Sequence, residues 1–383
     1  MKITFISCFD NYDIRIKPAI DFFEEKGIEC HYITSDFNHR SKSKKEVRPH
    51  KNTTLINVPG YVSNLSIKRI ISHIIFSFKV YKFIKKENPE VIYTIIPPNF
   101  LVYLFKNIYK KGNTKVIYDV YDMWPETFPI NKKNKLIQFI FSRWEKLRSK
   151  NIKYSNLIIT ECALFKDKIN RQNPDSLSEV LYLCGDDYDE NQDKRIDFSK
   201  NPESNSDEIT LSYIGSINNI FDIELTMQII KKVNELKKVK LLIIGDGEKR
   251  HEFLNRLDDS GIDYEFYGIV YDENKKQEIL QKSMFGLNIM KDSVFVGLTM
   301  KSIEYFKNGI PIINNINHDT EKLINNYKAG ININNEKDLI NEIIMCSNNI
   351  YNLKKNVQIL YKDKFSRQSY NNKMEKIWIE YLK

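Results

Sequence analysis

VGLTMKSIEYFKNGIP, residues 296–311, has the pattern of a turn, one short helix and a stop signal. Gly297 opens the turn, and Glu304 falls on the helix that follows. Gly309 suits the position where a left-handed residue ends a helix, and Pro311 prevents the helix from continuing. The stretch therefore predicts a unit that holds a ligand at the start of a helix.

Short apolar runs alternate with helical segments on both sides of this stretch, which is typical of parallel α/β sheets. Expected strands of the first half begin at Ile3, Glu29, Val91, Lys115 and Asn156, and those of the second at Ile209, Lys240, Tyr264, Met284 and Ile310. Helices are expected over 18–26 and 66–86. A third is expected to place Phe221, Leu225, Ile229, Val233 and Leu236 on one face.

The chain of 383 residues is too long for one ordinary core. A polar, turn-rich segment separates the two runs of strands and marks a domain boundary. We expect an N-terminal domain over 1–186, a linker over 187–207, a C-terminal domain over 208–365, and a last helix over 366–383 that packs back on the first domain. The predicted fold class is α/β, with two Rossmann-like, doubly wound domains facing a central cleft.

The composition, with 42% hydrophobic and 28% charged residues, is that of a globular protein. No apolar run approaches the roughly 18 residues of a membrane span, and the chain leads from Met1 straight into an expected strand. Five cysteines lack the spacing of a metal site, which favours buried thiols in a reducing compartment. We expect a cytoplasmic protein.

A net charge of +9 favours acidic partners. The lysines are scattered through a chain that is also rich in Asn and Ile, and AT-rich coding DNA would produce the same composition without any such partner. No nucleic-acid-binding motif accompanies the charge, so nucleic acid is not expected. An anionic membrane surface and a phosphate-bearing substrate remain.

Four motifs follow one another in the second half: YIGS at 213–216, IIGDGEKR at 243–250, FYGIV at 266–270, and VGLTMKSIEYFKNGIPII from Val296. Their succession resembles the C-terminal half of the retaining glycosyltransferases of family 4, which have the two-domain GT-B fold. In that family a glutamate eight residues after another glutamate holds the nucleotide ribose. Glu304 matches the second glutamate, and Val296 stands in place of the first.

The resemblance implies transfer of a sugar (EC 2.4 class) from a nucleotide-sugar donor to a saccharide or undecaprenyl-linked acceptor in cell-surface polysaccharide biosynthesis. Lys301 is the expected cation for the diphosphate, and a helix N-terminus supports it. No Asp-x-Asp follows a strand, so neither a metal nor a cofactor is expected. The expected donor-binding residues are Gly215, Ser216, Gly245, Gly247, Gly297, Leu298, Thr299, Lys301 and Glu304.

YDVYDMWPE, residues 118–126, resembles an acidic segment of family 4 enzymes that act on bacterial surface polysaccharides. Asp122 is the expected catalytic residue, and Asp119 is expected on the acceptor side. Arg15, expected in the loop after the first strand, is a candidate for an acceptor phosphate. The alternative is that Trp124 and its proline wedge a turn while the carboxylates are merely solvated.

The expected helix over 66–86 is basic and aromatic, so it can lie against an anionic membrane at the inner face of the plasma membrane. The alternative is that its apolar face packs on the first sheet. Two rival functions stay open: a GT-B nucleotide-sugar epimerase, and a non-catalytic partner subunit of another glycosyltransferase, which Val296 favours. The histidines have no Ser or Asp pairing of the kind found in a hydrolase triad.

Overall fold

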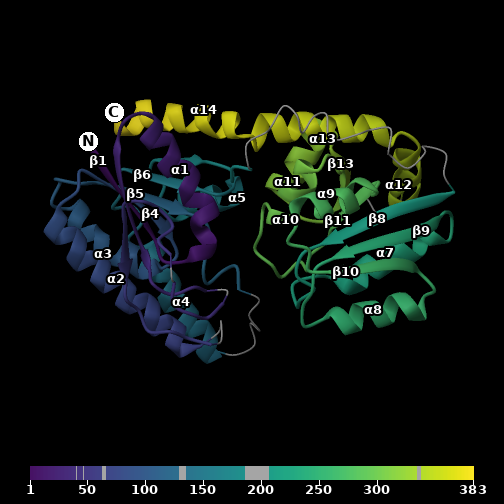
Figure 1. The fold of residues 1–383 in the computed structure, drawn as a ribbon, viewed down its shortest axis with the longest axis horizontal. Helices are drawn as coiled ribbons and strands as arrows, with labels where there is room; N and C mark the ends of the chain where they lie inside the picture. The colour runs from purple at the N-terminus through teal and green to yellow at the C-terminus, as the bar shows by residue number, and fades with distance from the viewer. Residues whose placement is uncertain (40, 46, 63–65, 129–134, 186–206, 334–337) are drawn as a thin grey trace. The chain divides into compact units, whose positions relative to one another are not determined.

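The computed structural model divides into two compact units (Figure 1). It describes residues 1–39, 41–45, 47–62, 66–128, 135–185, 207–333 and 338–383. Unit 1 comprises Met1–Cys184 and Tyr370–Lys383, and unit 2 comprises Gly185–Ser369. The expected linker, 187–207, lies outside the described residues except for Asp207.

Unit 1 contains a seven-stranded parallel sheet in the order β3-β2-β1-β4-β5-β6-β7. Its strands are β1 (Lys2–Ser7), β2 (Glu29–Ser35), β3 (Thr53–Ile56), β4 (Val91–Ile96), β5 (Lys115–Val120), β6 (Leu157–Thr160) and β7 (Ser178–Val180). The expected strands of this half are confirmed, and the short edge strands β3 and β7 are additions. The strand order reverses between β1 and β4, where doubly wound sheets place ligands beyond the carboxyl ends of their strands.

The helices of unit 1 are α1 (Asp13–Glu25), α2 (Ile67–Glu87), α3 (Asn99–Tyr109), α4 (Lys135–Ser149) and α5 (Ala163–Gln172). Unit 1 also contains α14 (Arg367–Ile377) from Tyr370 onward. Helix α3 contacts both α2 and α4, so the three helices lie side by side (Figure 1). The end of the chain contacts α1, because Lys26 pairs with Glu375 and the Phe23 and Trp378 ring centres lie 5.4 Å apart.

Helix α2 begins after Ser66, whose hydroxyl accepts a hydrogen bond from the Arg69 amide and caps the helix. Phe76 and Val80 are fully buried, as the packing alternative predicts. Ile67 and Phe78 are exposed, so a second apolar surface of the helix faces solvent.

Unit 2 contains a six-stranded parallel sheet in the order β10-β9-β8-β11-β12-β13. Its strands are β8 (Glu208–Ile214), β9 (Lys238–Ile244), β10 (Asp263–Gly268), β11 (Phe285–Asn288), β12 (Ile312–Asn314) and β13 (Gly330–Asn332). Its helices are α7 (Ile223–Asn234), α8 (Arg250–Asp259), α9 (Glu273–Gln281), α10 (Met300–Lys307), α11 (Asp319–Tyr327), α12 (Leu339–Asn348) and α13 (Ile350–Lys364). Strand order reverses between β8 and β11.

The first helix of unit 2 is confirmed, but one of its expected core residues is wrong. Leu236 lies beyond the last residue of α7 and is 61% exposed. Met227 and Ile230 take the buried face together with Ile229 and Val233. The helix therefore ends two residues before Leu236, the last residue of its apolar pattern.

Helix α10, the helix of the opening motif, is confirmed, and Gly309 follows its cap residue with φ of 68°. Tyr305 anchors the helix to the sheet. Its hydroxyl donates to the Ser212 carbonyl oxygen at 2.9 Å and accepts from the Ile214 amide at 3.0 Å. The ring lies against Gly286 on β11, where an added Cβ would overlap it.

We predict that Gly286→Ala lowers the free energy of unfolding by about 1–3 kcal/mol, because the new methyl group overpacks against Tyr305. Urea denaturation measures this change. Gly112→Ala is the matched control, since an added Cβ there meets no neighbouring atom and only the positive φ of 77° opposes it. Equal stability of Gly286→Ala and wild type would contradict the anchoring role of Tyr305.

Candidate functional site

Two glycine turns pack against each other at the carboxyl edge of the unit 2 sheet. An added Cβ on Gly245, whose φ is 141°, would overlap the carbonyl oxygen of Gly215. One on Gly247 would overlap the carbonyl oxygen of Ile217. The Ile217 amide donates to the Asp246 carbonyl oxygen at 3.0 Å. Gly245 and Gly247 are therefore required by backbone contact between the turns, and this contact fixes the turn that contains Gly215 and Ser216.

Lys301 lies in the first turn of α10, beside the first of these turns. Its Nζ is 4.1 Å from the centre of the Tyr213 ring and 5.6 Å from that of Phe221, within cation–π distance of both. Its Cε lies 3.4 Å from the position that a Cβ on Gly215 would occupy. Burial lowers the pKa of Lys301 to about 7. No described carboxylate pairs with this amine, so an incoming anion would be its counter-charge.

Glu304 lies one helical turn after Lys301. Its Oε1 is 3.0 Å from the Nζ of Lys276 and accepts from the Asn308 Nδ2 at 3.3 Å. Lys276 also pairs with Glu273 at 2.6 Å. Both contacts of the Glu304 carboxylate with described residues use Oε1, so Oε2 is available to accept hydrogen bonds.

A hydrogen-bonded row of asparagines holds the start of α10. Asn288, Asn314 and Asn332 end three neighbouring strands, and each Nδ2 donates to the next Oδ1, at 2.7 Å and 2.8 Å. Thr299 Oγ1 donates to Asn288 at 3.1 Å and accepts from the Ser302 amide at 2.9 Å, capping the helix. This row was not predicted from the sequence, where its only signal is an asparagine at the end of each short strand.

The turn before α10 is fixed as well. The Gly297 carbonyl oxygen accepts from both the amide and the hydroxyl of Thr320, at 2.9 Å and 2.8 Å. Leu298 is buried. The expected donor residues Gly297, Leu298 and Thr299 thus form one rigid turn, next to Lys301 and Glu304 on the helix.

The carboxyl edge of the unit 1 sheet carries Asp122, two residues after β5. Thr127 Oγ1 donates to its Oδ1 at 2.6 Å. Burial raises the pKa of Asp122 to about 6, so the carboxylate is mostly ionised at pH 7 and takes up a proton in mild acid.

An aromatic cluster lies beside Asp122, and two of its members, Trp124 and Arg69, interact with the Asp122 carboxylate. We call it the Trp124 cluster, formed by Phe9, Tyr61, Arg69, His73 and Trp124. The Arg69 guanidinium carbon lies 4.4 Å from the Trp124 ring centre and 5.3 Å from that of Phe9. The His73 ring stacks on Trp124 at 5.8 Å and 21°. Burial holds the pKa of His73 well below its ordinary value, so its ring is neutral at pH 7. Arg69 and His73 were not identified from the sequence as site residues.

The expected acceptor role of Arg15 and Asp119 is not supported. Arg15 lies on α1 rather than in a loop, and its side chain is fully buried. Its Nη2 and Nε contact the Asp119 carboxylate, each at 2.9 Å, and its Nη1 donates to the Leu181 carbonyl oxygen at 2.6 Å. Tyr93 donates to the same carboxylate at 2.6 Å. The pair binds β5 to α1 inside the unit and leaves no charge for a substrate.

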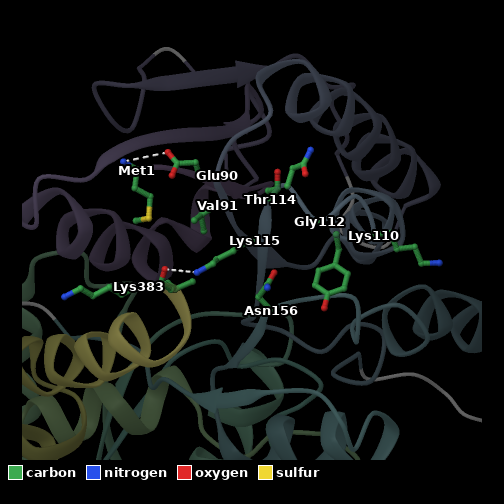
Figure 2. Close-up of a pocket in the computed structure, with 12 residues that line it drawn as sticks. Met1, Glu90, Val91, Lys110, Gly112, Thr114, Lys115, Asn156 and Lys383 are labelled. Carbon is green, nitrogen blue, oxygen red and sulfur yellow. Dashed lines mark hydrogen bonds and ion pairs between the residues drawn. The ribbon is translucent and has the colours of Figure 1, made fainter.

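A hollow of about 780 Å³ lies at the opposite, amino-terminal edge of this sheet (Figure 2). It is lined by Met1, Glu90, Val91 and Lys115, among others. Met1 pairs with Glu90 at 3.7 Å, and Lys115 donates to the Leu382 carbonyl oxygen at 2.9 Å. Because ligands of doubly wound sheets bind beyond the carboxyl ends, this hollow is not a candidate donor site.

Comparison with known protein families gives a match over residues 208–349, which fit the model described as "Glycosyl transferases group 1". The chain carries a group 1 glycosyltransferase domain. The match lies within unit 2 and includes both glycine turns and α10. The glycosyltransferase class, EC 2.4, and the family resemblance of the motifs are thereby confirmed. No protein of curated function matches the sequence.

Solved structures confirm the GT-B fold class. Sucrose-phosphate synthase from Thermosynechococcus elongatus is 10% identical, with a TM-score of 0.72 over 99% of this chain and 98% of that one. HepE of Anabaena in complex with UDP is 10% identical, with a TM-score of 0.68 over 99% and 100%. WaaG, a glycosyltransferase involved in lipopolysaccharide biosynthesis, is 13% identical, with a TM-score of 0.63 over 98% and 99%.

We predict that affinity for a nucleoside diphosphate falls above pH 7, by up to about 10-fold per pH unit, because the Lys301 amine is then neutral and must take up a proton to pair with the phosphates. Below pH 7 the amine is already charged, and this contribution is complete. Isothermal titration calorimetry in buffers of different ionisation enthalpy measures both the affinity and the proton uptake.

Lys301→Met should weaken binding and remove this pH dependence, whereas Lys322→Met, on an exposed lysine of the same unit, should change neither. A pH dependence that persists unchanged in Lys301→Met would assign it to another group.

Proposed function

We propose that the chain is a retaining glycosyltransferase that moves a sugar from a nucleotide-sugar donor to a saccharide or lipid-linked saccharide acceptor in cell-surface polysaccharide biosynthesis. One observation carries the proposal: Lys301 and Glu304 lie one turn apart on α10, beside the glycine turn that contains Gly215. This arrangement suits a ligand with an anionic group and vicinal hydroxyls, as a nucleoside diphosphate has.

The chemistry follows from where charge develops. As the bond to the sugar breaks, negative charge grows on the diphosphate, and the Lys301 ammonium and the N-terminus of α10 stabilise it. The departing phosphate oxygen takes the proton of the acceptor hydroxyl, on the same face of the sugar. Configuration is then retained without a protein nucleophile. We propose that no metal is required, since Lys301 supplies the cation.

Asp122 is proposed to act on the acceptor side. Its carboxylate is mostly ionised at pH 7 and can accept a hydrogen bond from the acceptor hydroxyl, orienting that group for attack. The Trp124 cluster supplies flat aromatic surface near this carboxylate.

Two relatives support the substrate class by their own properties. HepE of Anabaena binds UDP, and WaaG takes part in lipopolysaccharide biosynthesis. Residues Lys79, Lys82, Lys85 and Lys86 of α2 further support contact with an anionic membrane surface, where a lipid-linked acceptor would lie. None of the described helices is apolar over a length that would cross a bilayer.

Val296 favours a second candidate, a non-catalytic partner of another glycosyltransferase, because it offers no carboxylate where the family has one. Incubation with a panel of nucleotide sugars, scored by release of free nucleotide, separates the two functions. Release that survives excess EDTA supports the metal-free mechanism. Absence of release with every donor, together with no binding of nucleoside diphosphates at millimolar concentration, would contradict the transferase proposal and favour the non-catalytic one.

We predict that Glu304→Ala raises the dissociation constant for the nucleoside diphosphate by about 10- to 100-fold, because hydrogen bonds from ribose hydroxyls to a carboxylate contribute roughly 1.5–3 kcal/mol. Calorimetry measures the change. Glu273→Ala is the matched control, since it removes the other carboxylate on Lys276 and leaves Glu304 in place. Unchanged affinity in Glu304→Ala would show that Glu304 does not bind the nucleotide and serves only in the ion pair with Lys276.

We predict that Asp122→Asn lowers sugar transfer at least about 10-fold while leaving the nucleotide affinity unchanged. In the wild type, the rate should rise with pH as Asp122 ionises near pH 6. Thr127→Val, which removes only the hydrogen bond to Asp122, should shift this pH dependence upward with a smaller loss of rate. Near-normal turnover of Asp122→Asn would exclude Asp122 from the reaction.

A further inference from the structure

A groove lies between α2, α3 and α4 of unit 1, with a volume of about 560 Å³. Its walls are apolar and aromatic, formed chiefly by Phe100, Tyr103, Ile140 and Trp144. Four cations belong to its lining: Lys106, Arg143, Lys146 and Lys150. None of the described lining residues is acidic, so the groove combines apolar walls with uncompensated positive charge.

Aromatic rings hold two of the basic side chains at the rim. The Nζ of Lys106 lies 4.2 Å from the Tyr103 ring centre, and the guanidinium carbon of Arg143 lies 5.1 Å from that of Phe139. A cation over an aromatic face sits at the boundary between apolar surface and water. The headgroup region of a bilayer has the same character.

Large apolar side chains flank the groove and face solvent. On α4, Leu136, Phe139 and Ile140 are 67%, 57% and 50% exposed, and on α2, Ile67 and Phe78 are 76% and 44% exposed. Phe78 contacts Phe100 of the groove wall, so the apolar surface continues from α2 onto α3. Exposed apolar residues gathered on neighbouring helices mark an interaction surface.

Two lining residues, His73 and Asn99, keep buried polar atoms without a hydrogen-bond partner among the described residues: His73 Nε2 and Asn99 Oδ1. Asn99 Nδ2 donates to the Trp124 carbonyl oxygen at 2.9 Å, which fixes its amide orientation. Buried polar groups without partners are costly, and a ligand in the groove could complete both of these. A phosphate oxygen can accept from His73, and a hydroxyl can donate to Asn99.

We propose that this groove seats the headgroup of an anionic membrane lipid that bears a phosphate and hydroxyls, while the exposed residues of α2 and α4 lie among the acyl chains. The lipid site deepens the proposed function, because it would hold the chain where a lipid-linked acceptor lies. Only this purpose of the site rests on the proposed function.

Flotation with vesicles of phosphatidylcholine, with and without phosphatidylglycerol, tests the proposal on the full chain in the absence of nucleotide. Wild type should float with the anionic vesicles only. Three sets of four substitutions to Gln remove equal charge: the groove set (Lys106, Arg143, Lys146, Lys150), the α2 set (Lys79, Lys82, Lys85, Lys86) and a unit 2 set of exposed lysines (Lys231, Lys232, Lys275, Lys322).

Substitution of the groove set should lower the partition coefficient by about 30-fold or more, since each cation near an anionic surface contributes substantially to membrane binding. The α2 set should lower it less, and the unit 2 set should not change it. Circular dichroism and unchanged nucleoside diphosphate affinity confirm that each variant is folded. Equal losses in the groove and α2 sets would show diffuse attraction and overturn the proposal.

Trp144 provides a local probe of the groove. Phosphatidylglycerol brominated on acyl carbons near the headgroup should quench the tryptophan fluorescence of the wild type, and Trp144→Phe should lose most of this quenching. Trp378→Phe, which removes a tryptophan next to Phe23, should retain it. Quenching that is unchanged in Trp144→Phe would place the lipid elsewhere.

A free phosphate compound in solution could also present a phosphate group to the groove. Inorganic phosphate and glycerol phosphate at matched ionic strength should not displace the chain from the vesicles. Displacement by either, or failure of the wild type to float, would overturn the lipid site. Nucleotide binding and donor turnover are measured separately, so either proposal can fail without the other.

Discussion

The hydroxyl of Tyr305 is the link on which the geometry of unit 2 depends. It donates to one backbone group of β8 and accepts from another, so α10 cannot slide or rotate on the sheet without breaking both bonds. Gly286 leaves the space in which the ring lies. Because α10 is held against β8, Lys301 meets the turn that follows that strand, and Glu304 lies one helical turn further on. The asparagine row fixes the other end of the same helix, because Asn288 accepts a hydrogen bond from the capping residue Thr299.

In unit 1 a buried ion pair, rather than a tyrosine hydroxyl, holds a helix against the sheet. The Arg15–Asp119 pair lies wholly inside the unit, with a tyrosine hydroxyl and a carbonyl oxygen completing its hydrogen bonds. A buried pair of this kind contributes little net stability, but the loss of one partner leaves an isolated charge and is strongly destabilising. The pair therefore fixes the end of β5 relative to α1, and Asp122 follows three residues later. Asp119 positions the chain, and Asp122 faces the cluster in which chemistry is proposed.

The elements that the sequence predicted well are those with local signals. The expected strands of both sheets are apolar runs between turn residues, and α10 has its stop at Gly309 within the same stretch. The short edge strands β3, β7 and β13 have no such run. Helix α3 was not predicted because its segment, NFLVYLFKNIY, is apolar on most sides, and periodicity cannot separate a buried helix from a strand. The early end of α7 at Asn234 was missed because Leu236 continues the apolar spacing beyond the helix.

The parts of the site that the sequence could not reveal depend on residues far apart in the chain. Arg15 and Asp119 are 104 positions apart, and nothing near either residue indicates the other. The asparagine row depends on the register of three strands, which a single sequence does not specify. The residue types of the proposed donor site were visible from its motif. The contact of Lys301 with Tyr213 could be recognised only once the fold was known.

The environment of Lys301 also has a chemical consequence. An amine with a pKa of about 7 is roughly half unprotonated in neutral solution, whereas ordinary lysines are almost fully protonated there. Only the unprotonated amine has a lone pair for bond formation. The same burial therefore makes the Lys301 amine more nucleophilic at neutral pH than an ordinary lysine of the chain. In the proposed nucleotide site, an electrophilic nucleotide analogue would form its covalent bond with this amine.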